Sequence, residues 1–169
     1  MRNEKCRQNT SDNYHVIEST SDINERIEDF FYDTFYLPEE LGPLPRDIIY
    51  LPYYQRYYRN LGSREGDFCF EAYDASTNET VGIVWTRMVN DSPWLGSVPY
   101  LLIAVAAPHR GRGIGSLLMS HILAKLRNAG YTKVALSVHR QNRAITLYKR
   151  LGFSVCGSDD ESYTMIRYL

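Results

Sequence analysis

The clearest chemistry in the sequence is offered by a basic, glycine-rich stretch, Arg-Gly-Arg-Gly-Ile-Gly, at residues 110–115. It follows an apolar run at 101–106 and Pro108, an order that predicts a strand, a turn and a helix beginning near Gly113. The first amides of a helix lack intrahelical partners and lie at the positive end of its dipole. Glycines allow close backbone approach and positive φ, and arginines donate charge-assisted hydrogen bonds. The stretch therefore predicts a site for a ligand that carries a pyrophosphate.

Other phosphate-binding patterns fit this stretch less well. A dinucleotide fingerprint has Gly-x-Gly-x-x-Gly with an acidic residue about 20 positions further on. Here the spacing is Gly-x-Gly-x-Gly, and residues 131–134 contain no acidic side chain. A Walker loop would end in Gly-Lys-Ser/Thr, which this stretch lacks. The plainer alternative is a glycine-rich turn between strand and helix, with incidental arginines.

The same stretch resembles motif A of the GNAT superfamily of acyl-CoA-dependent N-acyltransferases. In that motif a strand is followed by Val-x-x-Pro, then by Arg/Gln-x-x-Gly-x-Gly/Ala, and then by a helix. The matching residues here are Val105, Pro108, Arg110, Gly113 and Gly115. Residues 142–153, NRAITLYKRLGF, resemble motif B of the same superfamily, although Ala144 lies one position from the commonest spacing. Together the two motifs extend the resemblance over residues 100–153.

The resemblance implies a co-substrate and a set of contacts. Acetyl-CoA would lie in the gap between two splayed parallel strands, with its pyrophosphate on the glycine turn. The implied contacts are made by Ile103, Val105, Arg110, Gly111, Arg112, Gly113, Ile114, Gly115, Ser116, Asn142, Tyr148 and Arg150. Two of these positions also have simpler explanations, because Asn142 suits a helix cap and Arg150 suits a solvated helix face. No metal is implied.

The resemblance also implies two catalytic groups. The backbone N–H of Val105 would stabilise the carbonyl oxygen of the thioester as it gains charge. The phenol of Tyr148 would be the general acid, because a group with a pKa of about 10 can donate a proton or a hydrogen bond to the departing thiolate. Judged only by its place on an apolar helical stripe, Tyr148 could also be a core aromatic residue.

The proton of the attacking amine has no obvious acceptor in this sequence. Many members of the superfamily carry a Glu or Asp on the strand before the glycine turn, but residues 100–103 read Tyr-Leu-Leu-Ile. The candidate bases elsewhere are Glu71, His139 and, through a water molecule, Tyr100. A structural role is the simpler interpretation of each. We therefore predict that proton removal is weakly assisted or mediated by water.

Tyrosines crowd residues 47–61, which we predict to be a helix broken or started at Pro52. The five are Tyr50, Tyr53, Tyr54, Tyr57 and Tyr58, and they fall on two adjacent helical faces. They suit a core and an amphipathic surface. Alternatively, one or two of them line an acceptor pocket, because tyrosine joins an apolar body to a polar tip.

A mixed sheet is needed to bring these residues together. We predict helices at 23–35, 47–61, 113–128 and 142–151, strands at 14–17, 68–73, 80–89, 100–106, 131–139, 153–156 and 163–168, and a loop at 90–99. The strand–helix–strand unit at 100–139 implies one parallel pair in a mostly antiparallel sheet. The expected fold is α/β, a GNAT-like mixed sheet with a splayed parallel pair, flanked by helices. It forms a single domain at 14–169 after a flexible N-terminus at 1–13.

Length and composition limit the classes of function. With 169 residues and a net charge of −1, the chain gives no reason to expect nucleic acid or an anionic membrane as a partner. The polar N-terminus and short apolar runs predict neither a signal peptide nor a membrane span. Three widely spaced cysteines, Cys6, Cys69 and Cys156, predict reduced thiols in the cytoplasm and no metal pair.

We therefore expect an N-acetyltransferase that moves an acetyl group from acetyl-CoA directly to the primary amine of a small molecule, as a monomer or homodimer. A covalent acyl-enzyme is not indicated, because no cysteine lies in either motif. The alternatives are acetylation of protein N-termini or lysines, a non-catalytic acyl-CoA-binding regulatory module, and a nucleotide-binding α/β module.

Overall fold

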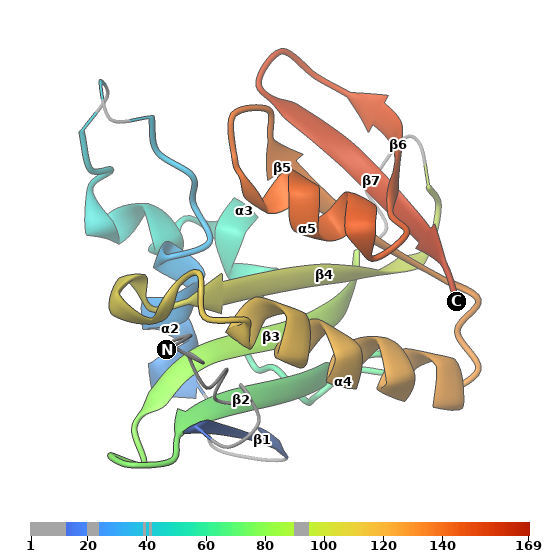
Figure 1. Ribbon diagram of the computed structural model, residues 1–169. Helices are drawn as coiled ribbons and strands as arrows, with labels where there is room; N and C mark the ends of the chain where they lie inside the picture. The colour runs from blue at the N-terminus through green and yellow to red at the C-terminus, as the bar shows by residue number, and fades with distance from the viewer. Residues whose placement is uncertain (1–12, 20–23, 39, 41, 90–94) are drawn as a thin grey trace, which may run out of the picture.

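The computed structural model describes residues 13–19, 24–38, 40, 42–89 and 95–169, and it is built on a seven-stranded sheet (Figure 1). The strands are β1 (Tyr14–Glu18), β2 (Phe68–Asp74), β3 (Thr80–Val89), β4 (Val98–Val105), β5 (Lys133–His139), β6 (Ser154–Ser158) and β7 (Ser162–Tyr168). They lie in the order β1-β2-β3-β4-β5-β7-β6. All neighbouring pairs are antiparallel except β4 and β5, which are parallel. The predicted mixed sheet is confirmed.

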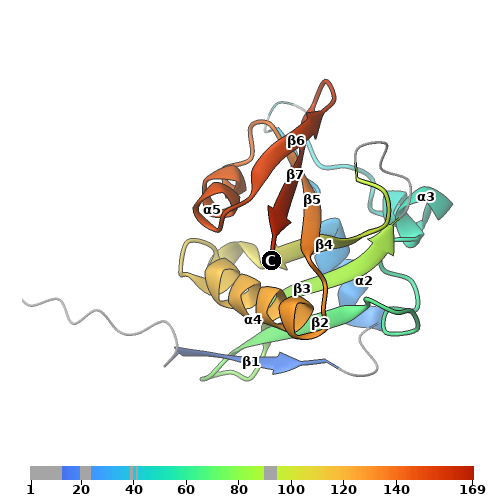
Figure 2. The same cartoon turned by 90° about the vertical axis from the view of Figure 1, so that its right-hand side faces the viewer.

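Helices cover both faces of the sheet, as Figure 2 shows. One face carries α4 (Ile114–Asn128) and α5 (Ala144–Arg150), and the other carries α2 (Asn24–Tyr32), the 3-10 helix η2 (Arg46–Tyr50) and α3 (Pro52–Gln55). A short 3-10 helix, η3 (Ala107–His109), leads from β4 to the glycine turn. The sheet therefore separates two layers of helices.

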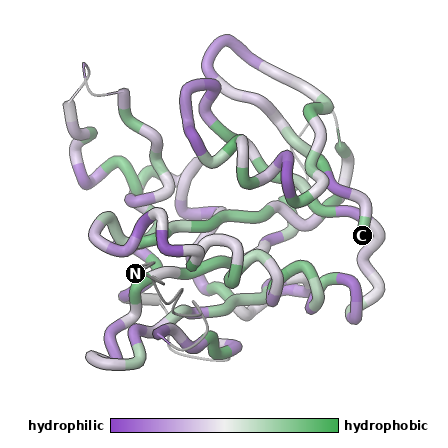
Figure 3. Tube along the Cα trace, in the orientation of Figure 1, coloured by the Kyte–Doolittle hydropathy of each residue, from purple (hydrophilic) through white to green (hydrophobic). Residues whose placement is uncertain are grey.

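Each face of the sheet has its own hydrophobic core. Leu118, Ile122 and Leu126 of α4 are fully buried in the larger core. On the opposite face, Phe31 of α2 packs in a second core with Trp85 of β3. Figure 3 shows the matching distribution, with hydrophobic segments along the central strands and hydrophilic ones at the turns. The alternation of side chains along the strands divides them between the two cores.

Several element boundaries differ from the predicted ones. The helix predicted at 23–35 ends at Tyr32, where a turn follows and the hydroxyl of Thr34 donates to the carbonyl oxygen of Phe31 (2.7 Å). β4 begins at Val98, inside the predicted loop 90–99, whose first five residues lie outside the described part of the chain. Of the N-terminus predicted to be flexible, the structure describes Asn13 alone.

The helix predicted at 47–61 is wrong beyond Gln55. Leu51 separates η2 from α3 with a ψ of 136°, the extended conformation expected before a proline. Residues 56–62 then form turns. The carbonyl oxygens of Arg56, Arg59 and Asn60 accept hydrogen bonds from the guanidinium group of Arg87 on β3. A side chain distant in the sequence therefore satisfies carbonyl groups that a helix would satisfy itself.

Arg87 and Asp67 form a buried ion pair that fixes this connection. The Nε and Nη2 atoms of Arg87 donate to the two carboxylate oxygens of Asp67, at 3.0 and 2.6 Å. The same carboxylate accepts the backbone N–H groups of Gly62 and Arg64. Both charged side chains are 0% exposed. The pair therefore ties the turns at 56–67 to the centre of the sheet.

We predict that Arg87→Met lowers the free energy of unfolding by about 3–5 kcal/mol, because it leaves Asp67 as an uncompensated buried charge. For a chain of this length the melting temperature should fall by about 6–20 °C, as measured by circular dichroism. The double variant Arg87→Met/Asp67→Leu is the control, and it should recover part of the loss because neither charge remains. Losses that simply add in the double variant would contradict the pairing.

Candidate active site

The backbone of β4 presents hydrogen-bonding groups on the edge that faces away from β3. Residues of an antiparallel pair alternate between bonding each other and pointing their N–H and C=O groups outward. The N–H of Ala106 donates to the carbonyl oxygen of Val81 (2.9 Å), so Val105 and, two residues earlier, Ile103 point outward. In agreement, the carbonyl oxygen of Val105 accepts a hydrogen bond from Arg110 Nε (2.8 Å).

β5 does not pair with that part of β4. Within these two described strands, the parallel register is recorded only at Tyr100 and Ala135. Beyond this point the ribbons of β4 and β5 separate (Figure 1). The amides of Ile103 and Val105 therefore face an opening between strands instead of a partner strand. The predicted splayed parallel pair is confirmed.

The glycine-rich turn adopts the backbone conformation that its sequence predicts. Gly111 and Gly113 have φ angles of +75° and +86°, and Gly113 precedes α4 without a side-chain cap. The first amides of α4 are therefore available to a ligand. Gly115 lies inside the helix, where an added Cβ would stand 3.3 Å from Leu147 of α5. Its missing side chain allows α4 and α5 to approach each other.

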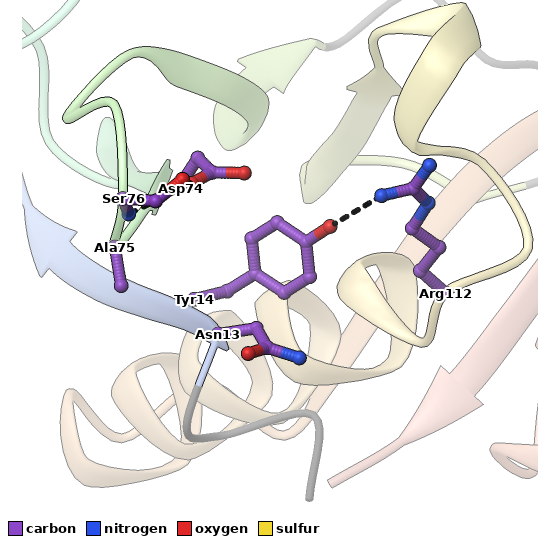
Figure 4. Close-up of a pocket in the computed structure, with 6 residues that line it drawn as sticks. All are labelled: Asn13, Tyr14, Asp74, Ala75, Ser76 and Arg112. Carbon is purple, nitrogen blue, oxygen red and sulfur yellow. Dashed lines mark hydrogen bonds between the residues drawn. The ribbon is translucent and has the colours of Figure 1, made fainter. Parts of the chain in front are cut away.

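Two arginines flank the start of α4. Arg150 at the end of α5 donates to the hydroxyl of Ser116 (3.2 Å). Arg112 extends in the other direction, toward the hydroxyl of Tyr14 (3.4 Å), across a cavity of about 320 Å³ (Figure 4). The cavity is lined by Asn13, Tyr14, Asp74, Ala75, Ser76 and Arg112. Arg110, in contrast, is held at the end of β4 by its bond to Val105. The structure thus brings together Arg150 and the helix amides, and the side chain of Arg112 extends from the same turn toward β1.

Two polar residues predicted from motif B are Asn142, two residues before α5, and Tyr148, within α5. The side-chain oxygen of Asn142 accepts the backbone N–H of Ala144, the first residue of α5 (2.9 Å), and the side-chain NH₂ group stays available. Tyr148 is 7% exposed, and its ring packs edge-to-face on Phe153. Burial raises the pKa of Tyr148 to about 12. Among the described residues its hydroxyl has no hydrogen-bond partner.

Glu71, the first candidate base, is held in an ion pair. It is 2% exposed, and its carboxylate accepts two hydrogen bonds from Arg26, at 3.1 and 3.3 Å. The strand register places Glu71 opposite Ile83 and Ile83 opposite Ala104. Two strand spacings, about 10 Å, therefore separate Glu71 from β4. This geometry favours the structural interpretation of Glu71.

The other two candidates, His139 and Tyr100, lie on the face of the sheet that α2 covers. The ring of His139 stacks on Tyr36, with centroids 4.7 Å apart. The ring of Tyr100 lies 5.7 Å from that of Tyr57. Burial raises the pKa of Tyr57, and a hydrogen bond with Tyr53 raises it further. Nothing in the sequence pattern singled out Tyr36, because it follows the predicted helix in an aromatic run without periodicity.

Comparisons of sequence identify related proteins. A sequence model of the Acetyltransferase (GNAT) family matches residues 24–153. Mycothiol acetyltransferase of Mycobacteroides abscessus is 36% identical over 91 residues, which cover 53% of this chain and 30% of the relative. Streptothricin acetyltransferase of Streptomyces lavendulae is 33% identical over 109 residues, which cover 60% of this chain and 58% of the relative. The chain thus matches less than two thirds of either relative's length.

Comparisons of structure identify the same fold. PaiA N-acetyltransferase from Thermoplasma acidophilum, solved in complex with coenzyme A, has a TM-score of 0.66 at 16% identity, covering 92% of this chain and 99% of that one. A GCN5-related N-acetyltransferase from Kribbella flavida has a TM-score of 0.66 at 22% identity, covering 94% and 99%. No helix of the described residues is long and apolar enough to cross a membrane. The same residues contain no group of three His, Cys, Asp or Glu that could hold a metal ion.

The geometry of the turn predicts how coenzyme A changes thermal stability. Gly111→Ala and Gly130→Ala, at opposite ends of α4, both place a Cβ at positive φ with open space around it. Each should lose about 1–2 kcal/mol through backbone strain. Coenzyme A at about 100 times its Kd should raise the melting temperature of the wild type and of Gly130→Ala by about 5–10 °C. Gly111→Ala should retain less than half of that rise in scanning fluorimetry. Equal rises in both variants would show that this turn does not hold the ligand.

Proposed function

The chain belongs to the GNAT family of acetyltransferases, and we therefore propose that it transfers the acetyl group of acetyl-CoA directly to the primary amine of a small molecule. The observation that carries the proposal is the juxtaposition of outward-facing amides at Ile103 and Val105 with the uncapped start of α4. Acyl-CoA is a ligand whose thioester carbonyl oxygen and pyrophosphate oxygens both need hydrogen-bond donors. Relatives named for streptothricin and mycothiol support a small acceptor.

The residues around α4 suit the binding of acetyl-CoA, which supplies the thioester whose acetyl group is transferred. The amides of the glycine turn and the side chains of Arg112 and Arg150 would bind the pyrophosphate, since a helix N-terminus and guanidinium groups both favour anions. The backbone of Ile103 and the side-chain NH₂ group of Asn142 would bind the pantetheine arm.

Val105 and Tyr148 would act on the two charges that develop during transfer. The N–H of Val105 would stabilise the carbonyl oxygen as the amine attacks. Tyr148, with a pKa of about 12, stays protonated at neutral pH and would donate a hydrogen bond to the sulfur as the C–S bond breaks. A free thiol has a pKa of about 8.5, so the leaving thiolate needs only this hydrogen bond and not the whole proton of Tyr148.

Direct transfer is favoured by the positions of the cysteines. Cys69 is buried on the face that α2 covers, and burial raises the pKa of its thiol. Cys156 is exposed on β6, at the edge of the sheet, and Cys6 lies outside the described residues. A nucleophilic cysteine needs a lowered pKa and a position near the reacting atoms.

We further propose a cytoplasmic enzyme that acts as a monomer or homodimer, without nucleic acid or membrane as a partner.

Tyr148→Phe tests the catalytic proposal. It should lower kcat by about 10- to 150-fold, the loss of a hydrogen bond to a charged group worth about 1.5–3 kcal/mol. The stabilisation of the fold by coenzyme A should persist. Steady-state kinetics on a panel of amines measures kcat, and Tyr168→Phe, at a residue 74% exposed, is the control. A wild-type protein that binds coenzyme A but acetylates no amine would instead be a non-catalytic acyl-CoA-binding module.

The pH profile tests how the amine loses its proton. Since Glu71 is bound to Arg26, we expect water to accept the proton and the acceptor's own pKa to govern the rate. The value of kcat/KM should rise with pH up to the pKa of the amine, about 8 for an α-amine and about 10.4 for a lysine-like amine. An inflection that stays fixed for both acceptors would reveal a base in the enzyme. A loss of more than tenfold in Glu71→Gln would identify that base as Glu71.

A further inference from the structure

His139 ends β5, across the opening from the part of β4 where acetyl transfer is proposed to occur. Tyr100 and Ala135 are in register, so counting four residues along both parallel strands brings His139 level with Ala104. Val138 of β5 packs in the core under α4, and side chains alternate along a strand. His139 therefore projects from the opposite face, the one from which an acceptor can approach while α4 and α5 hold acetyl-CoA.

The hydrogen bond at one ring nitrogen determines what the other can do. The backbone N–H of Gln141 donates to Nδ1 of His139 (3.2 Å). A neutral imidazole has one protonated and one unprotonated nitrogen, so the proton lies on Nε2. Among the described residues Nε2 has no hydrogen-bond partner. In this state His139 presents an N–H donor and has no lone pair free to take a proton from an amine.

The ring is also held in orientation by Tyr36. The two rings are stacked, with centroids 4.7 Å apart and planes 26° apart. Both side chains are half-buried. The hydrogen bond from Gln141 and the stacking on Tyr36 together hold the imidazole in one orientation, with its Nε2–H as the donor. Tyr36 is therefore a positioning residue.

We propose that the Nε2–H of His139 binds a carbonyl or carboxylate oxygen on the carbon next to the acceptor's amine, so that the acceptors are α-amino acids or their amides. The inference rests on the proposed function, because it needs the amine to attack near Val105. His139 stands across the opening at the level of Ala104, so an oxygen on the carbon next to the attacking nitrogen is the one placed to reach it. A simple alkylamine offers no such oxygen.

The same face of the sheet carries a pair of aromatic rings further along β4. Tyr100 projects from the same face four residues before Ala104, a distance of about 13 Å along the strand. Its ring and that of Tyr57 form a pair there. Aromatic rings pair favourably with each other in offset and edge-to-face arrangements. Test acceptors that share a phenyl group therefore keep any contact with these rings in common and differ only in the group that His139 is proposed to bind.

The test compares L-phenylalaninamide with 2-phenylethylamine, which differ by the carboxamide group. In the wild type we expect the ratio of kcat/KM to favour the amide. In His139→Phe, which keeps a ring to stack on Tyr36, this ratio should fall about five- to tenfold, with the change in the KM of the amide and not in kcat. Tyr36→Ala should lower the ratio in the same direction. His139→Gln, which restores an N–H donor, should recover part of it.

His15→Phe is the matched control, because His15 stacks on Tyr73 with centroids 5.3 Å apart at the far edge of the sheet. It should leave the ratio unchanged. An unchanged ratio in His139→Phe, or an equal fall for both amines, would overturn the inference and leave the proposed function standing. If the wild type binds acetyl-CoA but acetylates neither amine, the proposed function fails, and the inference fails with it.

Discussion

The alternation of hydrogen bonds along β4 is the constraint on which the site depends. The register with β3 commits Ala104 to that neighbour and turns the amides of Ile103 and Val105 to the opposite edge. Those amides stay open because, within the described parts of the two strands, β4 pairs with β5 only at Tyr100 and Ala135. The glycine turn and α4 follow β4 within a few residues. One strand therefore sets the positions of both the proposed acyl site and the proposed phosphate site.

The face of the sheet proposed to receive the acceptor is built by interactions that start on β3. Arg87 donates hydrogen bonds to carbonyl groups of the turns after α3 and forms an ion pair with Asp67. Two residues earlier, the indole N–H of Trp85 donates to the carbonyl oxygen of Tyr57 (2.9 Å). The aromatic pair of Tyr57 and Tyr100 is thus attached to β3, the strand that pairs with β4. Both faces of the site are therefore fixed by the same two strands.

Residue types and short-range periodicity made part of the fold and of the candidate site predictable. The positive φ angles of Gly111 and Gly113, the hydrogen bond of Asn142 to the first amide of α5 and the mixed sheet follow from residue types and periodicity. The helix predicted at 47–61 is wrong beyond Gln55 because carbonyl groups at 56–60 accept hydrogen bonds from Arg87, which lies more than 25 residues further on. No residue near 47–61 signals these long-range hydrogen bonds. The contact of Tyr36 with His139 joins segments about 100 residues apart, and a pattern of spacing cannot reveal it.

The ion pair that holds Glu71 on Arg26 and the donor role inferred for His139 favour the same acceptors. An enzyme that does not assist deprotonation works best on amines that are already neutral. At pH 7.4 about one fifth of an amine of pKa 8 is neutral, against about one thousandth of an amine of pKa 10.4. An oxygen-bearing carbon beside the amine lowers the amine's pKa, and it supplies the acceptor atom that Nε2–H can bind. The carbonyl or carboxylate group that His139 is proposed to bind is thus also the group that lowers the pKa of the amine, so that the amine is neutral without the help of a general base.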